Sequence, residues 1–421
     1  MDILNKSIRD FSFDEVVTFC QQGIPEGTQV DYKEDYPDKG FAKHLAAFSN
    51  TRGGVIILGV KENKTSGLPE TCVGVLDVAK KIERFHQEAT NVEPIPVYDI
   101  CATDEKNGKA FILIRIYEGN KPPYFVQNVS NVWIRNGSVS NPIDLASPDG
   151  LELLIGKREM AEKARMLCLQ RAEEVYKAGI DREEKKRKLA YEKGKLDGQE
   201  QSVVKFAIGS NTSLCTIALQ PYFPKDAIAE PRIIKEKLRD ITFRLGRAEY
   251  PVYSHQFETI PEGILSFSSR LSDGFVESHE FFGQGLIFNR HDVLIVQDDK
   301  SLISLYRIAH RIFLVLQFTK NFYNQFGYQG VVKGLIALEN VKDIYFVQIM
   351  PSGWNGYHDD TRGLLSKYDW EIDLDTRILN DPILLKEHYL KIIRDIYWSL
   401  GYENLQENLM EAFFRENGFI F

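Results

Sequence analysis

The feature that most constrains the fold is an unbroken apolar run at residues 55–60, which read VIILGV. A strand that is apolar at every position, rather than at alternate ones, is typical of a strand buried on both faces of a sheet. The pair Gly53-Gly54 stands directly before the run and predicts a tight turn into it. Residues 41–49, FAKHLAAFS, precede that turn and have the spacing of a short helix. The run and the helix before it predict a mixed α/β domain.

The chain divides into three predicted zones. Residues 1–147 form the mixed-sheet α/β domain, and residues 148–200 form a charged helical linker with EEKKRK at its centre. We expect this linker to be mostly solvated, as one long helix or as a hairpin broken near Gly179 or Gly194. Residues 201–421 are predicted to form a separate α+β domain that senses a signal or builds an oligomer. The patterns there predict strands at 216–219, 293–296 and 344–347 and helices at 303–324 and 383–400.

Composition limits the classes of partner. The 52 Lys and Arg residues against 60 Asp and Glu residues give a net charge of -8, so the whole chain does not attract phosphate backbones. A nucleic-acid partner would therefore require a local basic patch, or metal ions held by carboxylates. The five cysteines are scattered without a C-x-x-C pair, which argues against structural zinc and a disulfide scaffold. With no long apolar run and no apolar leader, we expect a cytoplasmic protein without membrane association.

The residues around the first predicted strand place charged side chains together. If residues 29–33 form a strand, Asp31 and Lys33 point to the same face. Glu26 has the wrong spacing for that face, so it must return from the Pro-Glu-Gly turn that precedes the strand. Glu62 follows the buried strand at 55–60, where loop residues of α/β sheets gather into sites. These groups converge if the two strands are neighbours.

Three converging carboxylates would repel one another unless a cation lies between them. Oxygen ligands of this kind select Mg²⁺ or Mn²⁺, and such an ion can activate water and offset charge on a phosphodiester. Lys33 would stabilise the same developing charge. Taken alone, three acidic residues in a chain this rich in Asp and Glu are more often surface charges. The residue pattern by itself leaves both interpretations open.

A resemblance supports the first interpretation. The order Glu-x4-Asp-x-Lys, the segment AAFSNTRGG, the run VIILGVKE, and the later segments PPYF and VWIRNGS resemble the AlbA-like domain of the Schlafen family. The resemblance covers about the first third of the chain. Nucleases of that family cleave RNA, notably transfer RNA, with three metal-binding acidic residues, which by motif position are Glu26, Asp31 and Glu62 here. Asp31 stands where Glu is usual and Glu62 where Asp is usual, so each carboxylate is displaced by about one methylene.

The resemblance implies a metal-dependent endonuclease that favours RNA over DNA. Its catalytic residues would be Glu26, Asp31, Lys33 and Glu62, with Mg²⁺ or Mn²⁺ as cofactor. A local basic rim for the nucleic acid is expected from Arg52, Lys61 and Arg135.

The C-terminal domain would control this activity or build a homo-oligomer, as in a bacterial anti-phage defence effector. The alternatives are a non-catalytic nucleic-acid-binding regulator with the same domain, and a scaffold protein whose carboxylates lie on the surface. Histidine 44, on the 41–49 helix, is expected to be a helix-surface residue.

Overall fold

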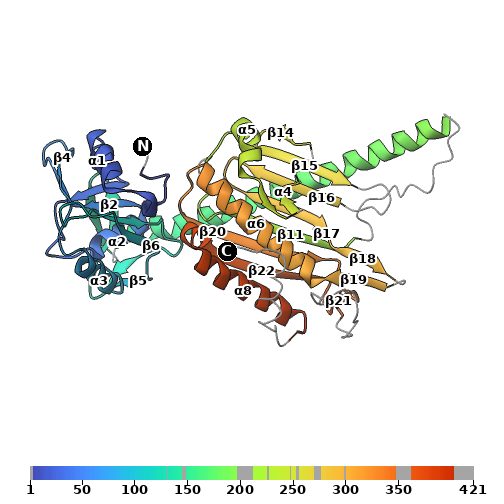
Figure 1. Ribbon diagram of the computed structural model, residues 1–421. Coiled ribbons are helices and arrows are strands. Elements are labelled where there is room, and N and C mark those ends of the chain that lie inside the picture. Colours follow the sequence, from blue (N-terminus) through green and yellow to red (C-terminus); the bar gives the residue numbers. More distant parts are fainter. Residues whose placement is uncertain are drawn as a thin grey trace. The chain divides into compact units, whose positions relative to one another are not determined.

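The computed structural model describes residues 3–129, 131–144, 148–196, 212–224, 227–246, 248–252, 256–269, 276–297, 300–347 and 362–402. The chain divides into two compact units (Figure 1). The first comprises Met1–Lys163 with Gly327–Val331, and the second comprises Ala164–Phe326 with Val332–Phe421. The division lies between Lys163 and Ala164, inside one long helix, whereas the predicted boundaries are at 147 and 200.

The first unit mixes short helices and strands, as predicted. Its elements are η1 (Ile8–Asp10), α1 (Phe13–Gln21), β1 (Val30–Lys33), α2 (Ala42–Asn50), β2 (Gly54–Leu58), β3 (Val60–Glu62), β4 (Pro69–Cys72), α3 (Val78–Ala89), β5 (Val92–Glu93), β6 (Tyr98–Ala102), β7 (Ile112–Ile116), β8 (Phe125–Val126), β9 (Asn131–Asn136) and β10 (Val139–Asp144). The described strands form a mixed sheet in the order β1-β2-β7-β6, a second sheet in the order β10-β9-β8-β5, and the pair β3-β4.

Strand β2 lies inside the mixed sheet, which confirms that the apolar run is buried on both faces. It pairs in parallel with β1 and antiparallel with β7. Ile56 and Leu58 pack on one face with residues of α2 and α3, while Val55 and Ile57 pack on the other with residues of α1. Strand β1 is at the edge of this sheet, so it pairs with another strand of the sheet along only one of its two edges.

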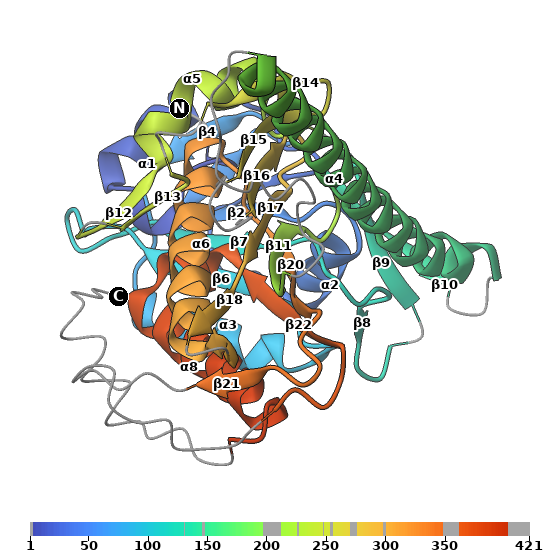
Figure 2. The ribbon, with the colours of Figure 1, turned by 90° about the vertical axis from the view of Figure 1, so that its right-hand side faces the viewer.

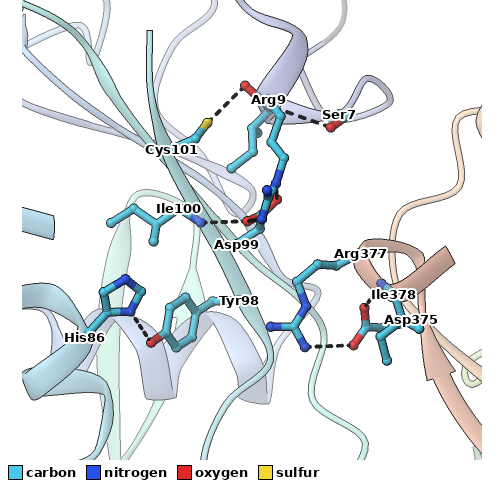
Figure 3. Close-up of polar contacts among 11 residues, drawn as sticks. Ser7, Arg9, His86, Tyr98, Asp99, Ile100, Cys101, Asp375, Arg377 and Ile378 are labelled. Carbon is cyan, nitrogen blue, oxygen red and sulfur yellow. Dashed lines mark hydrogen bonds and ion pairs between the residues drawn. The ribbon is translucent and has the colours of Figure 1, made fainter. Parts of the chain in front are cut away.

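The N-terminal segment is fixed to β6 by an ion pair. The guanidinium of Arg9 donates two hydrogen bonds to the carboxylate of Asp99, at 3.0 and 2.9 Å (Figure 3). Figure 3 also shows the imidazole of His86 beside the hydroxyl of Tyr98, at 2.8 Å. These contacts join η1, α3 and β6.

The second unit is built on a large antiparallel sheet. Its elements are β11 (Leu214–Pro221), α5 (Pro231–Ile241), β12 (Phe243–Leu245), β13 (Ala248–Tyr250), β14 (Glu258–Ile260), β15 (Gly263–Ser269), β16 (Val276–Phe282), β17 (Ile287–Asp292), β18 (Leu294–Gln297), β19 (Lys300–Ser304), α6 (Leu305–Gln325), β20 (Val331–Glu339), β21 (Tyr345–Val347), β22 (Lys367–Asp375), α7 (Thr376–Asn380) and α8 (Pro382–Ser399). The described strands give a seven-stranded sheet in the order β14-β15-β16-β17-β11-β20-β22, with β12-β13 and β18-β19-β21 beside it.

Helices cover both faces of the seven-stranded sheet. Figure 2 shows α6 on one face and α4 (Pro148–Leu196) on the other. Helix α6 is buried along most of its length, and Asp375 caps the short helix α7 through a hydrogen bond from the N–H of Ile378 (Figure 3). The α+β class predicted for this part of the chain is confirmed, and strands and helices lie close to the predicted ranges.

The long helix α4 confirms one predicted alternative and corrects the rest. It runs unbroken through Gly179 and Gly194, so the segment is one long helix and not a hairpin. It is also not a solvated linker throughout, because Ala172 packs with sheet residues such as Phe288, and Tyr176 packs against Val276. None of the helices in the described ranges is long and apolar enough to cross a membrane.

Candidate functional site

The edge strand β1 places two charged side chains on one face. Val30 and Tyr32 point into the apolar cluster beside α1, so Asp31 and Lys33 point to the opposite face, where α2 lies. The Nζ atom of Lys33 is 3.0 Å from Oδ2 of Asp31. Asp31 is only 1% exposed. The shared face predicted for these residues is confirmed.

Glu26 returns to this face from the segment before β1. Its Oε1 atom accepts a hydrogen bond from the backbone N–H of Tyr32 at 2.7 Å. The N–H of Gly27 donates to the carbonyl of Val30 at 3.0 Å, which closes the turn. Lys33 Nζ is 3.6 Å from Glu26 Oε1. A single lysine ammonium therefore lies near two carboxylates.

Glu62 reaches the same cluster from β3, and its carboxyl is close enough to raise the pKa of Glu26. The chain turns between β2 and β3 at Gly59, whose φ of +99° favours glycine. A Cβ at this position would also lie 2.5 Å from the Cα of Gly74. The structure thus brings Glu26 beside both other predicted carboxylates.

The surroundings shift the two innermost carboxyl groups in opposite directions. Burial, the neighbouring carboxyl of Glu62 and the charge of Asp31 raise the pKa of Glu26 from 4.5 to about 8. Burial also acts to raise the pKa of Asp31, but the nearby Lys33, His44 and Arg135 outweigh it and hold that pKa below its usual value. At neutral pH the cluster therefore contains an ionised Asp31 and a protonated Glu26.

His44 is part of this site, although we expected it on the helix surface. Its Nδ1 atom is 3.5 Å from Asp31 Oδ2, and its side chain is mostly buried. Burial lowers the pKa of His44 to about 4, so the imidazole is neutral at pH 7. A sequence signal exists, because His44 is three residues after Phe41 and so shares its buried face on α2.

The three predicted basic residues differ in exposure. Arg52 and Lys61 are exposed, and they stand before and after β2. Arg135, on β9, is buried. Its role in nucleic-acid binding stays a prediction, and the structure gives it other partners.

Arg135 supports Asp31 from the side opposite Lys33. Its Nη2 atom is 3.5 Å from Asp31 Oδ1 and donates to the carbonyl of Gly27 at 2.7 Å. The guanidinium also stacks 4.5 Å from the centre of the Phe48 ring. This buried cation offsets the buried charge of Asp31 and connects β9 to the turn that carries Glu26.

The side chain of Asn50 positions β9 over this site. Its amide donates to the carbonyls of Tyr124 and Trp133 at 2.7 and 2.9 Å, and its oxygen accepts from the N–H of Tyr124 at 2.7 Å. The ammonium of Lys43 lies 4.2 Å from the centre of the Trp133 ring. Tyr124 is therefore part of the core, while Trp133 is half-buried beside a cation.

The side chains of this site are of a type that binds hard divalent cations, but they are not arranged to hold one. Carboxylate oxygens are what Mg²⁺ and Mn²⁺ prefer, and Asp31 Oδ2 is a buried atom that makes an ion pair with Lys33 but accepts no hydrogen bond. Among the described residues, however, no group of three or more His, Cys, Asp or Glu side chains is placed to hold a metal ion. The Lys33 ammonium is the cation beside Asp31 and Glu26 in this arrangement.

Comparison with known proteins agrees with the geometry of this unit. Residues 26–144 match the family model described as Schlafen, AlbA_2. The matched residues contain every carboxylate and cation of the site. No curated protein matches the chain. The match indicates a nucleic-acid-related function for this unit. The N-terminal third of the chain is a Schlafen AlbA_2 domain.

Proposed function

We propose that this chain is a metal-dependent nuclease that cleaves RNA of the transfer-RNA type in preference to DNA. The observation that carries the proposal is the cluster in which the Lys33 ammonium lies 3.0 Å from Asp31 and 3.6 Å from Glu26. Glu62 is close enough to raise the pKa of Glu26, and the cluster lies inside a domain that matches Schlafen AlbA_2. Clusters of carboxyl groups with displaced pKa values are more frequent at functional sites than elsewhere. The cluster is therefore better explained by chemistry than by stability.

The residues of the cluster would have different roles. Glu26, Asp31 and Glu62 would hold Mg²⁺ or Mn²⁺, which supplies an activated water and offsets charge on the phosphodiester. Lys33 would donate to a phosphate oxygen as negative charge develops there. Because a carboxylate must lose its proton to bind a cation, the pKa of about 8 at Glu26 predicts metal affinity that rises with pH.

The net charge favours attraction of nucleic acid by local basic groups over attraction by the chain as a whole. With a net charge of -8, the chain must engage nucleic acid through particular cations such as the exposed Arg52 and Lys61. We also propose a role for the second unit. It restrains or triggers the nuclease, as a defence effector requires, or it forms a homo-oligomer.

The alternative is a non-catalytic nucleic-acid-binding regulator. One observation favours it: Lys33 already neutralises Asp31, and the described side chains form no metal-holding group. Such a regulator would bind nucleic acid equally well with and without its carboxylates.

The deciding experiment incubates the purified chain with transfer RNA, single-stranded DNA and duplex DNA. Each substrate is tested with Mn²⁺, with Mg²⁺ and with EDTA. Variants Glu26→Ala and Asp31→Ala are compared with Glu70→Ala, which removes an exposed carboxylate of β4. Metal-dependent cleavage that only the first two variants abolish supports the nuclease. Binding without cleavage by all variants supports the regulator.

A salt titration separates both hypotheses from a scaffold protein. Binding through phosphate contacts weakens as salt rises, with a slope of about 0.9 in log units for each contact to duplex DNA. We expect Arg52→Gln and Lys61→Gln each to reduce the slope by about 1. Binding that is absent, or independent of salt, would contradict both nucleic-acid hypotheses.

A further inference from the structure

Two cysteines that are distant in the sequence meet in the first unit. Cys20 lies in the last turn of α1, and Cys72 ends β4. Helix α1 and strand β4 are in contact, and both cysteines pack on the same apolar cluster. Their thiols are close enough that each shifts the pKa of the other. The other three cysteines contribute no such pair among the described residues.

The two thiols differ in reactivity. Cys20 is buried, whereas Cys72 is partly exposed. The interaction between the two thiols raises the pKa of Cys20, with burial adding to the effect, and lowers the pKa of Cys72. Cys72 is therefore the more readily ionised of the two. Because the thiolate is the nucleophile, Cys72 is the residue that reacts first with an oxidant.

We propose that Cys20 and Cys72 form a reversible disulfide when a peroxide oxidises the protein. The thiolate of Cys72 attacks one oxygen of hydrogen peroxide, which breaks the O–O bond, forms a sulfenic acid and releases hydroxide. The hydroxide takes the proton of Cys20. The Cys20 sulfur then attacks the Cys72 sulfur, and the S–O bond breaks. The second hydroxide leaves as water after taking up from the solvent the proton that Cys72 lost when it ionised. Two thiols and one peroxide thus give one disulfide and two waters.

The disulfide would act on the part of the unit that carries Glu62. Cys72 pairs with Val60 across the β3-β4 ladder, and Glu62 is two residues further along β3. Cys20 packs in the same cluster as Tyr32, whose backbone N–H holds Glu26. A bond between Cys20 and Cys72 would therefore fasten the β3-β4 hairpin to α1, on the face of the sheet opposite the carboxylates.

The test uses the full chain and does not depend on nuclease activity. The protein is treated with hydrogen peroxide, free thiols are blocked with iodoacetamide, and the sample is then reduced and labelled with N-ethylmaleimide. We expect peptide mass spectrometry to find the second label on Cys20 and Cys72 together, and the intact oxidised chain to have lost two hydrogen atoms. Dithiothreitol should restore both thiols.

Three variants sharpen the result. Cys20→Ser should leave Cys72 as a sulfenic acid that dimedone traps, and Cys72→Ser should leave Cys20 unoxidised. Cys101→Ser is the matched control, because Cys101 is also partly exposed but donates to the carbonyl of Ile8 (Figure 3). This variant should still form the disulfide.

The proposal is overturned if, in oxidised wild-type protein, Cys20 and Cys72 still react with iodoacetamide or are linked only between chains. The effect on the hairpin has its own test. Backbone amides of residues 60–72 should exchange with deuterium more slowly in the oxidised form. Unchanged exchange there would refute the effect on the hairpin that carries Glu62.

Discussion

At the scale of single residues, the site is defined by what surrounds each carboxyl group. Asp31 has Lys33 at 3.0 Å and Arg135 at 3.5 Å, so burial does not prevent its ionisation. Glu26 accepts a hydrogen bond from the N–H of Tyr32, but burial, the neighbouring carboxyl of Glu62 and the charge of Asp31 keep it protonated. Paired cations, rather than depth in the protein, decide which group carries the negative charge.

The proton on Glu26 predicts a pH-dependent stability. Its pKa rises from 4.5 to about 8 on folding, so between these values the folded chain holds a proton that the unfolded chain has lost. The stabilisation from this proton is complete below pH 4.5 and is lost as the pH rises through 8. Glu26→Gln cannot ionise, so its stability relative to wild type should rise across this window by up to about 1.4 kcal/mol per pH unit.

Urea unfolding at a series of pH values measures this difference. Glu70→Gln is the control, since Glu70 is an exposed carboxyl on β4 and its curve should run parallel to that of the wild type. If the Glu26→Gln curve is also parallel, the raised pKa of Glu26 is wrong.

Arg135 should be essential for stability because it is the buried cation beside Asp31. Arg135→Met removes the guanidinium and leaves Asp31 partly uncompensated, which we expect to cost about 3–5 kcal/mol of unfolding free energy. Arg52→Met, at an exposed arginine of the same unit, should change stability by no more than about 0.5 kcal/mol. Equal effects of the two variants in urea unfolding would contradict the buried ion pair.

Sequence reasoning located the charged residues of β1, but it did not show that α2 and β9 pack over them. The alternation of a strand placed Asp31 and Lys33 on one face, and the odd spacing of Glu26 placed it in a returning turn. His44 and Arg135 enter the site because α2 and β9 pack over β1. The helical spacing from Phe41 indicates that His44 is on a buried face, but no periodic pattern shows which distant strand that face covers. Cys20 and Cys72 were read as scattered for the same reason.

At the scale of elements, helix α4 shows how packing overrides a local pattern. Its charge density predicted a solvated linker, and its glycines left a broken hairpin as an alternative to one long helix. In the structure, Arg290 of β17 donates to Glu173 of α4 at 2.5 Å, and Gly179 faces the ring of Phe267. Gly179 therefore permits a close approach between helix and sheet rather than ending the helix.

Two glycines of α4 give a matched test of this explanation. A Cβ at Gly179 would lie 2.7 Å from the Phe267 ring, so Gly179→Ala should destabilise the chain by about 1 kcal/mol or more despite the better helix propensity of alanine. A Cβ at Gly156 would meet no described atom within 4 Å, so Gly156→Ala should stabilise by about 0.5–1 kcal/mol. Thermal unfolding measures both, and shifts of the same sign would contradict the close approach.

At the scale of the whole molecule, the chain combines a Schlafen AlbA_2 domain with a larger α+β unit. The net charge of -8 makes general attraction to nucleic acid unfavourable. Any function on nucleic acid must therefore depend on local groups, and the cluster of Glu26, Asp31, Glu62 and Lys33 is the strongest candidate. Its carboxylates would contribute to cleavage but not to the attraction of phosphate.

The most direct test measures cleavage and binding of the same transfer RNA in the presence of Mn²⁺. Wild type is compared with the isosteric variants Glu26→Gln, Asp31→Asn and Glu62→Gln, which keep the shape of each side chain and remove its ability to ionise. We expect each variant to retain binding and to lose at least about 100-fold in cleavage rate. Variants that cleave as fast as the wild type, or a wild type that binds this RNA without cleaving it, would contradict the account.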